Sequence, residues 1–210
     1  KLSLDGRGPR PETGPGGRRL YSSSDIMDLR RLLEAGAKAP GTYLPGRRAG
    51  DHLQVIAVIN FKGGSGKTTT SAHLAQKCAL DGYRVLAIDL DPQASLSALH
   101  GFQPEFDLAD GGTLYDAIRY DDPVPLAQVI QPTYFTNLSI VPGNLELMEF
   151  EHDTPRALAV RGGNLFFTRI SEALAGVEDD FDLVVIDCPP QLGFLTMSAL
   201  SAATAVLVTV

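Results

Sequence analysis

The sequence has few of the features that mark membrane, secreted or zinc-binding proteins. No apolar run reaches the roughly 18 to 20 residues that a membrane helix needs. The first residues do not combine a charged start with an apolar stretch, so no signal peptide is expected. The two cysteines, Cys78 and Cys188, lie far apart and outside any metal-ligand spacing, which excludes a disulfide framework and a zinc site. We therefore expect a cytoplasmic protein with reduced thiols and no membrane partner.

Charge is unevenly distributed along the 210 residues, whose formal net charge is -7. Residues 1–50 carry ten Lys and Arg against five acids, a net of +5, which leaves eight basic and 20 acidic residues, a net of -12, for the rest. A basic head on an acidic body favours an appendage with its own partner, most often nucleic acid, and a solvated tail is the alternative. The chain begins without Met and stops inside an apolar run, so we expect it to be truncated at both ends.

Composition divides the chain into four parts. Residues 1–17 are dominated by Gly, Pro and charge and are predicted to be disordered. Within 18–35, Ser24 can cap a helix whose apolar residues recur every three or four positions. Residues 36–52 contain Pro, Gly and paired Arg and are predicted to be a linker. The main domain is expected over 53–210.

Continuous apolar runs in the main domain indicate strands that are covered on both faces. These runs span 55–59, 85–88, 183–186 and 205–210, with 138–141 as a weaker fifth. Helices are predicted between them over 67–80, 114–119, 164–174 and about 195–203. Repeated alternation of strand and helix predicts an α/β fold, doubly wound around a mainly parallel sheet.

The strongest motif follows the first predicted strand directly and opens a helix: Lys62-Gly-Gly-Ser-Gly-Lys-Thr-Thr-Thr70. A glycine-rich turn between a strand and a helix directs backbone N–H groups and the helix dipole at one point, which predicts a phosphate site. Lys67 offers an ammonium to the terminal phosphates, and Thr68 offers a hydroxyl to Mg²⁺. The predicted nucleotide-binding residues are Lys62, Gly63, Gly64, Ser65, Gly66, Lys67, Thr68 and Thr69.

Three acidic residues follow the carboxyl ends of predicted parallel strands, which is where such sheets form their ligand-binding crevice. Asp89 and Asp91 follow the strand predicted over 85–88, and Asp187 follows the one over 183–186. Carboxylate oxygens suit the Mg²⁺ that accompanies a bound nucleotide. The alternative is that these acids only cap the next helix.

The ordinary phosphate-loop pattern requires glycine at position 61, where this chain has Phe61. With Lys62 at its start, the loop resembles the deviant Walker A box, K-G-G-x-G-K-[ST]. Asp89-Leu-Asp-Pro-Gln-Ala-Ser95 and Asp187-Cys-Pro-Pro190 resemble motifs of the ParA partition ATPases. The resemblance implies a P-loop ATPase that binds ATP or ADP with Mg²⁺. Asp91 would position the attacking water, Asp89 and Asp187 would support the metal through its waters, and Lys62 would reach the partner's phosphates across a homodimer.

The resemblance covers roughly residues 53–210. Phe61, Ser65, Ser198, Thr204 and the segment 96–100 are similar to the RepA plasmid-partition proteins of repABC replicons. The segment 17–26 is similar to the sequence motif that connects the wing to the following helix in winged helix-turn-helix modules of the MerR type. The head would then be the remnant of a DNA-reading module, with Arg18, Arg19 and Tyr21 as candidate phosphate contacts. A solvated basic helix is the alternative.

The resemblance implies an ATP-driven partition switch on the nucleoid. Mg²⁺-ATP would close two subunits, the dimer would bind DNA without sequence preference, and a partner similar to ParB or RepB would stimulate hydrolysis. Two alternatives stay open: an autorepressor that binds its operator, and a membrane-associated division ATPase similar to MinD. Adenine contacts and the main DNA surface are expected beyond Val210.

Overall fold

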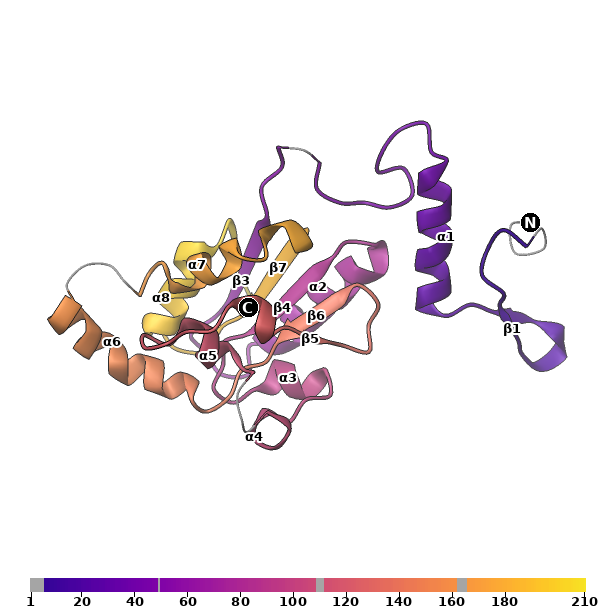
Figure 1. Cartoon of the computed structure of the whole chain (residues 1–210). Coiled ribbons are helices and arrows are strands. Elements are labelled where there is room, and N and C mark those ends of the chain that lie inside the picture. Colours follow the sequence, from indigo (N-terminus) through magenta and orange to yellow (C-terminus); the bar gives the residue numbers. More distant parts are fainter. Residues whose placement is uncertain (1–5, 49, 109–111, 162–165) are drawn as a thin grey trace.

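A six-stranded sheet forms the centre of the molecule in a computed structural model that describes residues 6–48, 50–108, 112–161 and 166–210 (Figure 1). The strand order is β5-β6-β4-β7-β3-β8, and neighbouring strands are parallel except β5 and β6. The strands are β3 (Gln54–Ile59), β4 (Val85–Asp89), β5 (Gln131–Pro132), β6 (Leu138–Val141), β7 (Leu183–Asp187) and β8 (Ala205–Val208). The predicted α/β class and the mainly parallel sheet are confirmed.

The central strands are apolar throughout because both of their faces are covered. Every residue of β4 and β7 is buried. In β4, Val85 and Ala87 face one apolar cluster, whereas Leu86 and Ile88 face a second cluster on the opposite side. Side chains alternate between the faces of a strand, so a strand between two cores shows a continuous apolar run.

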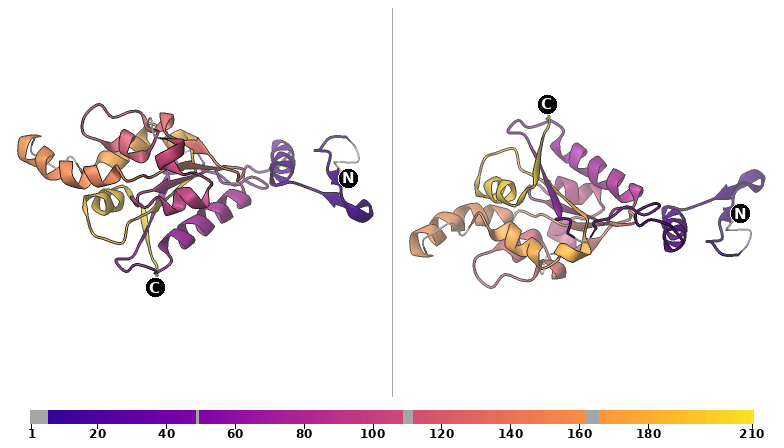
Figure 2. Two further views of the ribbon diagram at one scale, coloured as in Figure 1. Left: turned by 90° about the horizontal axis from the view of Figure 1, so that it is seen from below. Right: turned by 90° about the horizontal axis from the view of Figure 1, so that it is seen from above.

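Helices supply the two layers. On one face lie α2 (Lys67–Asp81) and α3 (Ser95–Leu99), and on the other α5 (Leu114–Ile118), α6 (Leu147–Arg161), α7 (Arg169–Ala175) and α8 (Phe194–Ala202) (Figure 2). The short α4 (Pro104–Asp107) follows α3. Single-turn 3₁₀ helices occur at η2 (Leu126–Gln128) and η3 (Glu178–Asp180). The helix predicted over 164–174 begins at Arg169 in the structure, and Asn164 lies outside the described residues.

The head contains a small hairpin and one helix. Strands β1 (Glu12–Thr13) and β2 (Arg19–Leu20) pair antiparallel around the 3₁₀ turn η1 (Pro15–Gly17), and α1 (Ser23–Ala35) follows. The hairpin differs from the disorder expected over 1–17, because Gly16 and Gly17 take φ of +71° and +73° and let the chain reverse. Residues 1–5 of that segment lie outside the described residues.

The helix α1 starts two residues earlier than its expected cap implies. Ser22 is the N-cap instead of Ser24: its hydroxyl accepts the backbone N–H of Asp25 at 3.1 Å. The Asp25 carboxylate accepts the backbone N–H of Ser22 at 2.8 Å, which completes a capping box.

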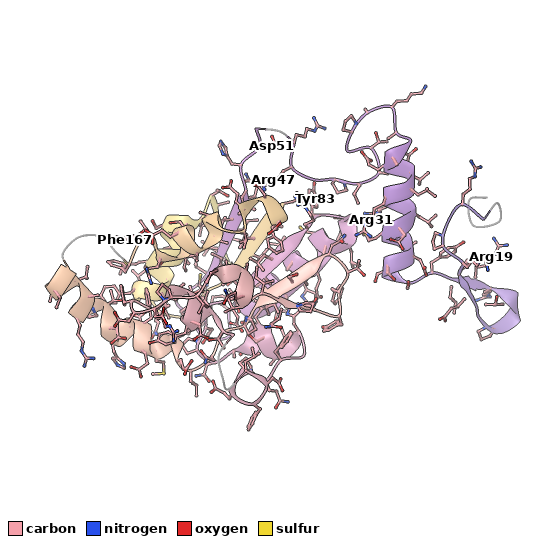
Figure 3. The ribbon with its side chains drawn as sticks, viewed as in Figure 1. Arg19, Arg31, Arg47, Asp51, Tyr83 and Phe167 are labelled. Atoms are coloured by element: carbon pink, nitrogen blue, oxygen red, sulfur yellow. The ribbon has the colours of Figure 1, made fainter. Side chains whose placement is uncertain are left out.

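The segment expected to be a linker makes specific contacts. The Glu34 carboxylate accepts the backbone N–H groups of Tyr43 at 2.8 Å and Gly41 at 2.5 Å, and these bonds lower the pKa of Glu34. The backbone N–H of Arg47, which is labelled in Figure 3, donates to the Asp182 carboxylate at 3.0 Å. Asp182 also forms an ion pair with Arg84. The part of 36–52 that precedes residue 49 is therefore anchored to both the head and the body.

None of the helices within the described residues is both long and apolar enough to cross a membrane.

Candidate functional site

The candidate site lies where three neighbouring strands end. β4, β7 and β3 are adjacent and parallel, so the turns after Ile59, Asp89 and Asp187 emerge at the same edge of the sheet. Asp89 and Asp187 are direct partners in the register of β4 and β7. This edge is where open parallel sheets bind ligands.

The phosphate loop spans the gap between β3 and α2. Gly64 and Gly66 take φ of +75° and +79°, left-handed values that glycine adopts without strain. Gly66 is the N-cap of α2 and provides no side-chain cap, so the first-turn N–H groups of this 15-residue helix are open to an anion. The Lys67 side chain lies inward, with the residue only 7% exposed, whereas Lys62 is exposed.

Residues that directly follow β3 and β8 hold the loop. The Asn60 side-chain oxygen accepts the backbone N–H of Lys62 at 2.7 Å, and its amide nitrogen donates to the Thr209 carbonyl at 2.5 Å. The hydroxyls of Thr209 and Ser65 lie 3.0 Å apart. The loop's conformation therefore depends on β8 as well as on its own glycines.

Asp187 lies at the base of the loop with one oxygen available. Its Oδ1 accepts the Ser71 hydroxyl of α2 at 3.0 Å, while its buried Oδ2 has no hydrogen-bond partner among the described residues. Burial raises the pKa of Asp187 to about 6, although the Thr68 and Ser71 hydroxyls favour the charged form. A buried carboxylate oxygen without a partner costs free energy that a cation or an ordered water can offset.

Asp89 is fully buried and ties the next turn to the sheet. Its Oδ2 accepts both the backbone N–H and the hydroxyl of Ser97 at 2.7 Å. Burial raises the pKa of Asp89 to about 7, against the bonds from Ser97 and with a further rise from the neighbouring Asp187. Gly143 packs against this turn so closely that a Cβ would lie 2.6 Å from the Asp89 carbonyl oxygen.

Asp91 is half-buried at the turn that follows β4. Its Oδ1 accepts the backbone N–H of Gln93 at 2.9 Å, and its charge contributes to the raised pKa of Asp187. Its own backbone N–H lies 3.3 Å from Asp89 Oδ1. The same turn therefore holds one fully buried carboxylate, Asp89, and one half-buried carboxylate, Asp91.

The donor set fits a hard divalent cation beside a phosphate. Two buried carboxylates with raised pKa values, an unpartnered Asp187 oxygen and the partly buried Thr68 hydroxyl supply the oxygen ligands that Mg²⁺ prefers. A bound cation would stabilise the charged form of both carboxylates.

The structure places the other predicted residues elsewhere. Arg18, Arg19 and Tyr21 are exposed on and next to the β1–β2 hairpin, which lies away from β3 and α2 (Figure 1). Burial raises the pKa of both thiols, Cys78 and Cys188, which disfavours their thiolate forms.

Several residues that contact the loop, the β4 turn or the start of α8 are not among those predicted from the sequence. Asn60 and Thr209 hold the loop, Gly143 packs on the β4 turn, and Glu151 contacts the start of α8. A polar residue at the end of an apolar strand is a weak signal for Asn60. Nothing in the local sequence signals the pairing of Glu151 with α8, because 43 residues separate the two partners.

Comparison with known proteins agrees with this geometry. A family model described as AAA domain matches residues 53–210. "Putative replication protein A" of Sinorhizobium fredii is 59% identical, over 100% of this chain and 52% of the relative. The sporulation initiation inhibitor protein Soj of Bacillus subtilis is 34% identical, over 75% of this chain and 58% of the relative. The chain thus spans about half the length of the curated relatives it matches.

Solved structures share the fold. Cobyrinic acid a,c-diamide synthase from Mycobacterium smegmatis, crystallised with an ATP analog and magnesium, matches with a TM-score of 0.66 and 35% identity over 75% of this chain and 60% of that one. A plasmid partition protein from Borrelia burgdorferi matches with a TM-score of 0.62 and 25% identity over 75% of this chain and 65% of that one. With the AAA-domain match over 53–210 and a phosphate loop that carries both Lys62 and Lys67, the chain belongs to the ParA family of P-loop partition ATPases.

Proposed function

We propose that this chain is an ATP-driven switch for DNA partition. The observation that carries the proposal is the phosphate loop itself, where Lys62 and Lys67 accompany open N–H groups at the start of α2 and Asp187 presents an unpartnered oxygen. The presence of an ATP analog and magnesium in the structure of the synthase relative supports the choice of ligand.

The proposed roles follow from position. Backbone N–H groups from Gly63 to Thr69 would bind the phosphates, and Lys67 would neutralise their charge. Mg²⁺ would be held by the Thr68 hydroxyl and, through water, by Asp89 and Asp187. When bound, the metal supplies neutralisation of the charge that develops during phosphoryl transfer. Asp91, which is half-buried at the turn after β4, would orient the attacking water.

Lys62 is the proposed link between two subunits. Its backbone is fixed by Asn60 while its side chain is exposed, so the ammonium can extend away from its own loop toward a second molecule. A lysine in this position would neutralise phosphate charge across a nucleotide-dependent homodimer.

Dimerisation would couple nucleotide state to DNA binding. Joining two basic surfaces increases the number of phosphates neutralised, which raises both the affinity and its salt dependence. Within the described residues, Arg18 and Arg19 are exposed on the basic head and are candidates for such contacts. A centromere-binding partner similar to ParB or RepB would accelerate ATP hydrolysis. Hydrolysis would then release the dimer from the nucleoid DNA.

The proposal predicts that Lys62→Ala abolishes nucleotide-dependent dimerisation while the protein still binds ATP. Sedimentation velocity with Mg²⁺ and a slowly hydrolysed ATP analogue should show a dimer for the unsubstituted protein and a monomer for the variant. Lys77→Ala, which removes an exposed lysine paired with Asp81 on the same side of the sheet, should dimerise normally. A Lys62→Ala protein that dimerises as well as the unsubstituted one would rule out the proposed role across the interface.

A further inference from the structure

The helix α8 begins without a cap of its own and receives one from α6. Its N-cap, Gly193, has no side chain to accept the free first-turn N–H groups. The Glu151 carboxylate accepts them instead, with Oε2 at 3.0 Å from the Phe194 nitrogen and Oε1 at 2.9 Å from the Leu195 nitrogen. A negative charge at this end of a helix also interacts favourably with the helix dipole.

The carboxylate lies close against the Gly193 backbone. A Cβ on Gly193 would lie 2.3 Å from Glu151 Oε1, far inside van der Waals contact. A side chain at position 193 would therefore displace the Glu151 carboxylate from the first-turn N–H groups of α8.

The segment held in this way connects the site to α8. Residues 188–193 lead from Asp187 to the start of the helix, and the Cys188 N–H donates to the Val58 carbonyl at 3.2 Å at the near end. Glu151 fixes the far end. Both ends of a six-residue segment that follows the unpartnered carboxylate are thus anchored.

The helix α6, which carries Glu151, begins shortly after the turn that packs against Asp89. α6 starts at Leu147, shortly after Gly143, whose N–H donates to the Ser97 hydroxyl at 3.1 Å. That hydroxyl in turn donates to Asp89. The turn after β4 is thus contacted by a residue just before α6, and the segment after β7 by a residue within the first two turns of α6.

We propose that Glu151 is a positioning residue for hydrolysis, which keeps the 188–193 segment and the turn carrying Asp89 and Asp91 in their relative places. This inference rests on the ATPase function proposed above. Glu151 differs from the acids around it, because Glu149 is exposed on the same helix and Asp153 forms a surface ion pair with Arg156.

The test compares Glu151→Gln with Glu149→Gln, which makes the same change of charge on the exposed face. The glutamine can offer only one acceptor oxygen to two N–H groups, so we expect kcat for ATP to fall by on the order of 10-fold, as small misplacements of reacting groups do. The Kd for nucleotide should stay within about 2-fold, because the variant leaves the phosphate loop and its helix N-terminus intact. Glu149→Gln should match the unsubstituted protein in both quantities.

A second variant and a structural measurement make the test independent of charge. Gly193→Ala should displace the carboxylate and lower kcat in the same way, and the double variant should be no worse than either single one. Amide hydrogen exchange at Phe194 and Leu195 should accelerate in Glu151→Gln without nucleotide and stay unchanged in Glu149→Gln.

Two results would overturn the inference. One is an unchanged kcat in Glu151→Gln despite faster exchange at α8, and the other is a parallel loss of thermal stability, nucleotide affinity and kcat, which would indicate a general role in folding. Absence of ATP turnover in the unsubstituted protein would instead contradict the proposed function. The unsubstituted protein is assayed first, so the two failures are distinguishable.

Discussion

Lys67→Ala is expected to weaken the binding of Mg²⁺-ATP by at least about 100-fold, the loss that follows from removing one buried charge partner at about 3 kcal/mol. The Lys67 ammonium is nearly buried, and its hydrogen bond to the Lys62 carbonyl is long at 3.4 Å. A buried ammonium with so weak a contact should gain favourable interaction free energy when phosphate oxygens bind beside it, because charge-assisted hydrogen bonds are stronger than neutral ones. Its removal should therefore affect binding itself.

Titration of a fluorescent ATP analogue by equilibrium fluorescence measures the effect. Lys77→Ala is the matched control, since this lysine lies on the same helix and is exposed beside Asp81. The control should bind like the unsubstituted protein. An affinity of Lys67→Ala within about threefold of the parent value, less than 1 kcal/mol, would show that the nucleotide does not lie on this loop as we describe it.

Asp91→Asn should reduce ATP turnover by roughly 10² to 10⁴, the range over which a positioned side chain that handles a reacting proton contributes to rate. The asparagine keeps an oxygen for the Gln93 N–H, so the turn after β4 should hold its shape while the charge is lost. Nucleotide binding and dimerisation should persist, because neither the loop N–H groups nor Lys67 is altered. The variant would accumulate in the ATP-bound state.

Phosphate release at saturating ATP, together with the nucleotide titration, separates the two effects. Asp179→Asn serves as control: it removes an exposed carboxylate in η3, which precedes β7 and so lies at the opposite edge of the sheet from Asp187. Turnover at the parental rate in Asp91→Asn would show that another group orients the water.

The core of the fold and the phosphate loop are predictable because their signals are local. Each central strand is buried on both faces and therefore appears as a continuous apolar run, as in Val85 to Ile88. Gly82, just past α2, takes a left-handed φ of +112°, as expected of a glycine that ends a helix. The loop is encoded in consecutive residues between a strand and a helix, so its place in the fold follows from its sequence.

The supports of the site were not predictable because they depend on contacts between distant segments. The acids from Glu146 to Asp153 appear in the sequence as an exposed helix face, yet Glu151 caps α8. Asn60 and Thr209, 149 residues apart, meet only because β8 pairs with β3. Register and side-chain direction, which follow from the whole sheet, decide these contacts.

Neighbouring acidic residues of one motif also differ in how deeply they are buried. Asp89 and Asp91 are two positions apart in one motif, but Asp89 is fully buried with two bonds to Ser97, whereas Asp91 is half-buried. The sequence places both at a strand end without showing which one the fold uses. The strand register distinguishes them, since Asp89 pairs with Asp187 inside the sheet and Asp91 follows it outside.

Fluorescence anisotropy of a random-sequence DNA duplex tests the central claim most directly, with the protein titrated in the absence of nucleotide, with ADP, and with Mg²⁺-ATP at one stated salt concentration. We predict binding only with ATP, and weaker binding as salt rises, because DNA affinity depends on released counterions. Binding that is indifferent to nucleotide, or that requires one operator sequence and ADP, would contradict the partition switch and favour a repressor. Failure to bind DNA in any nucleotide state would contradict it as well.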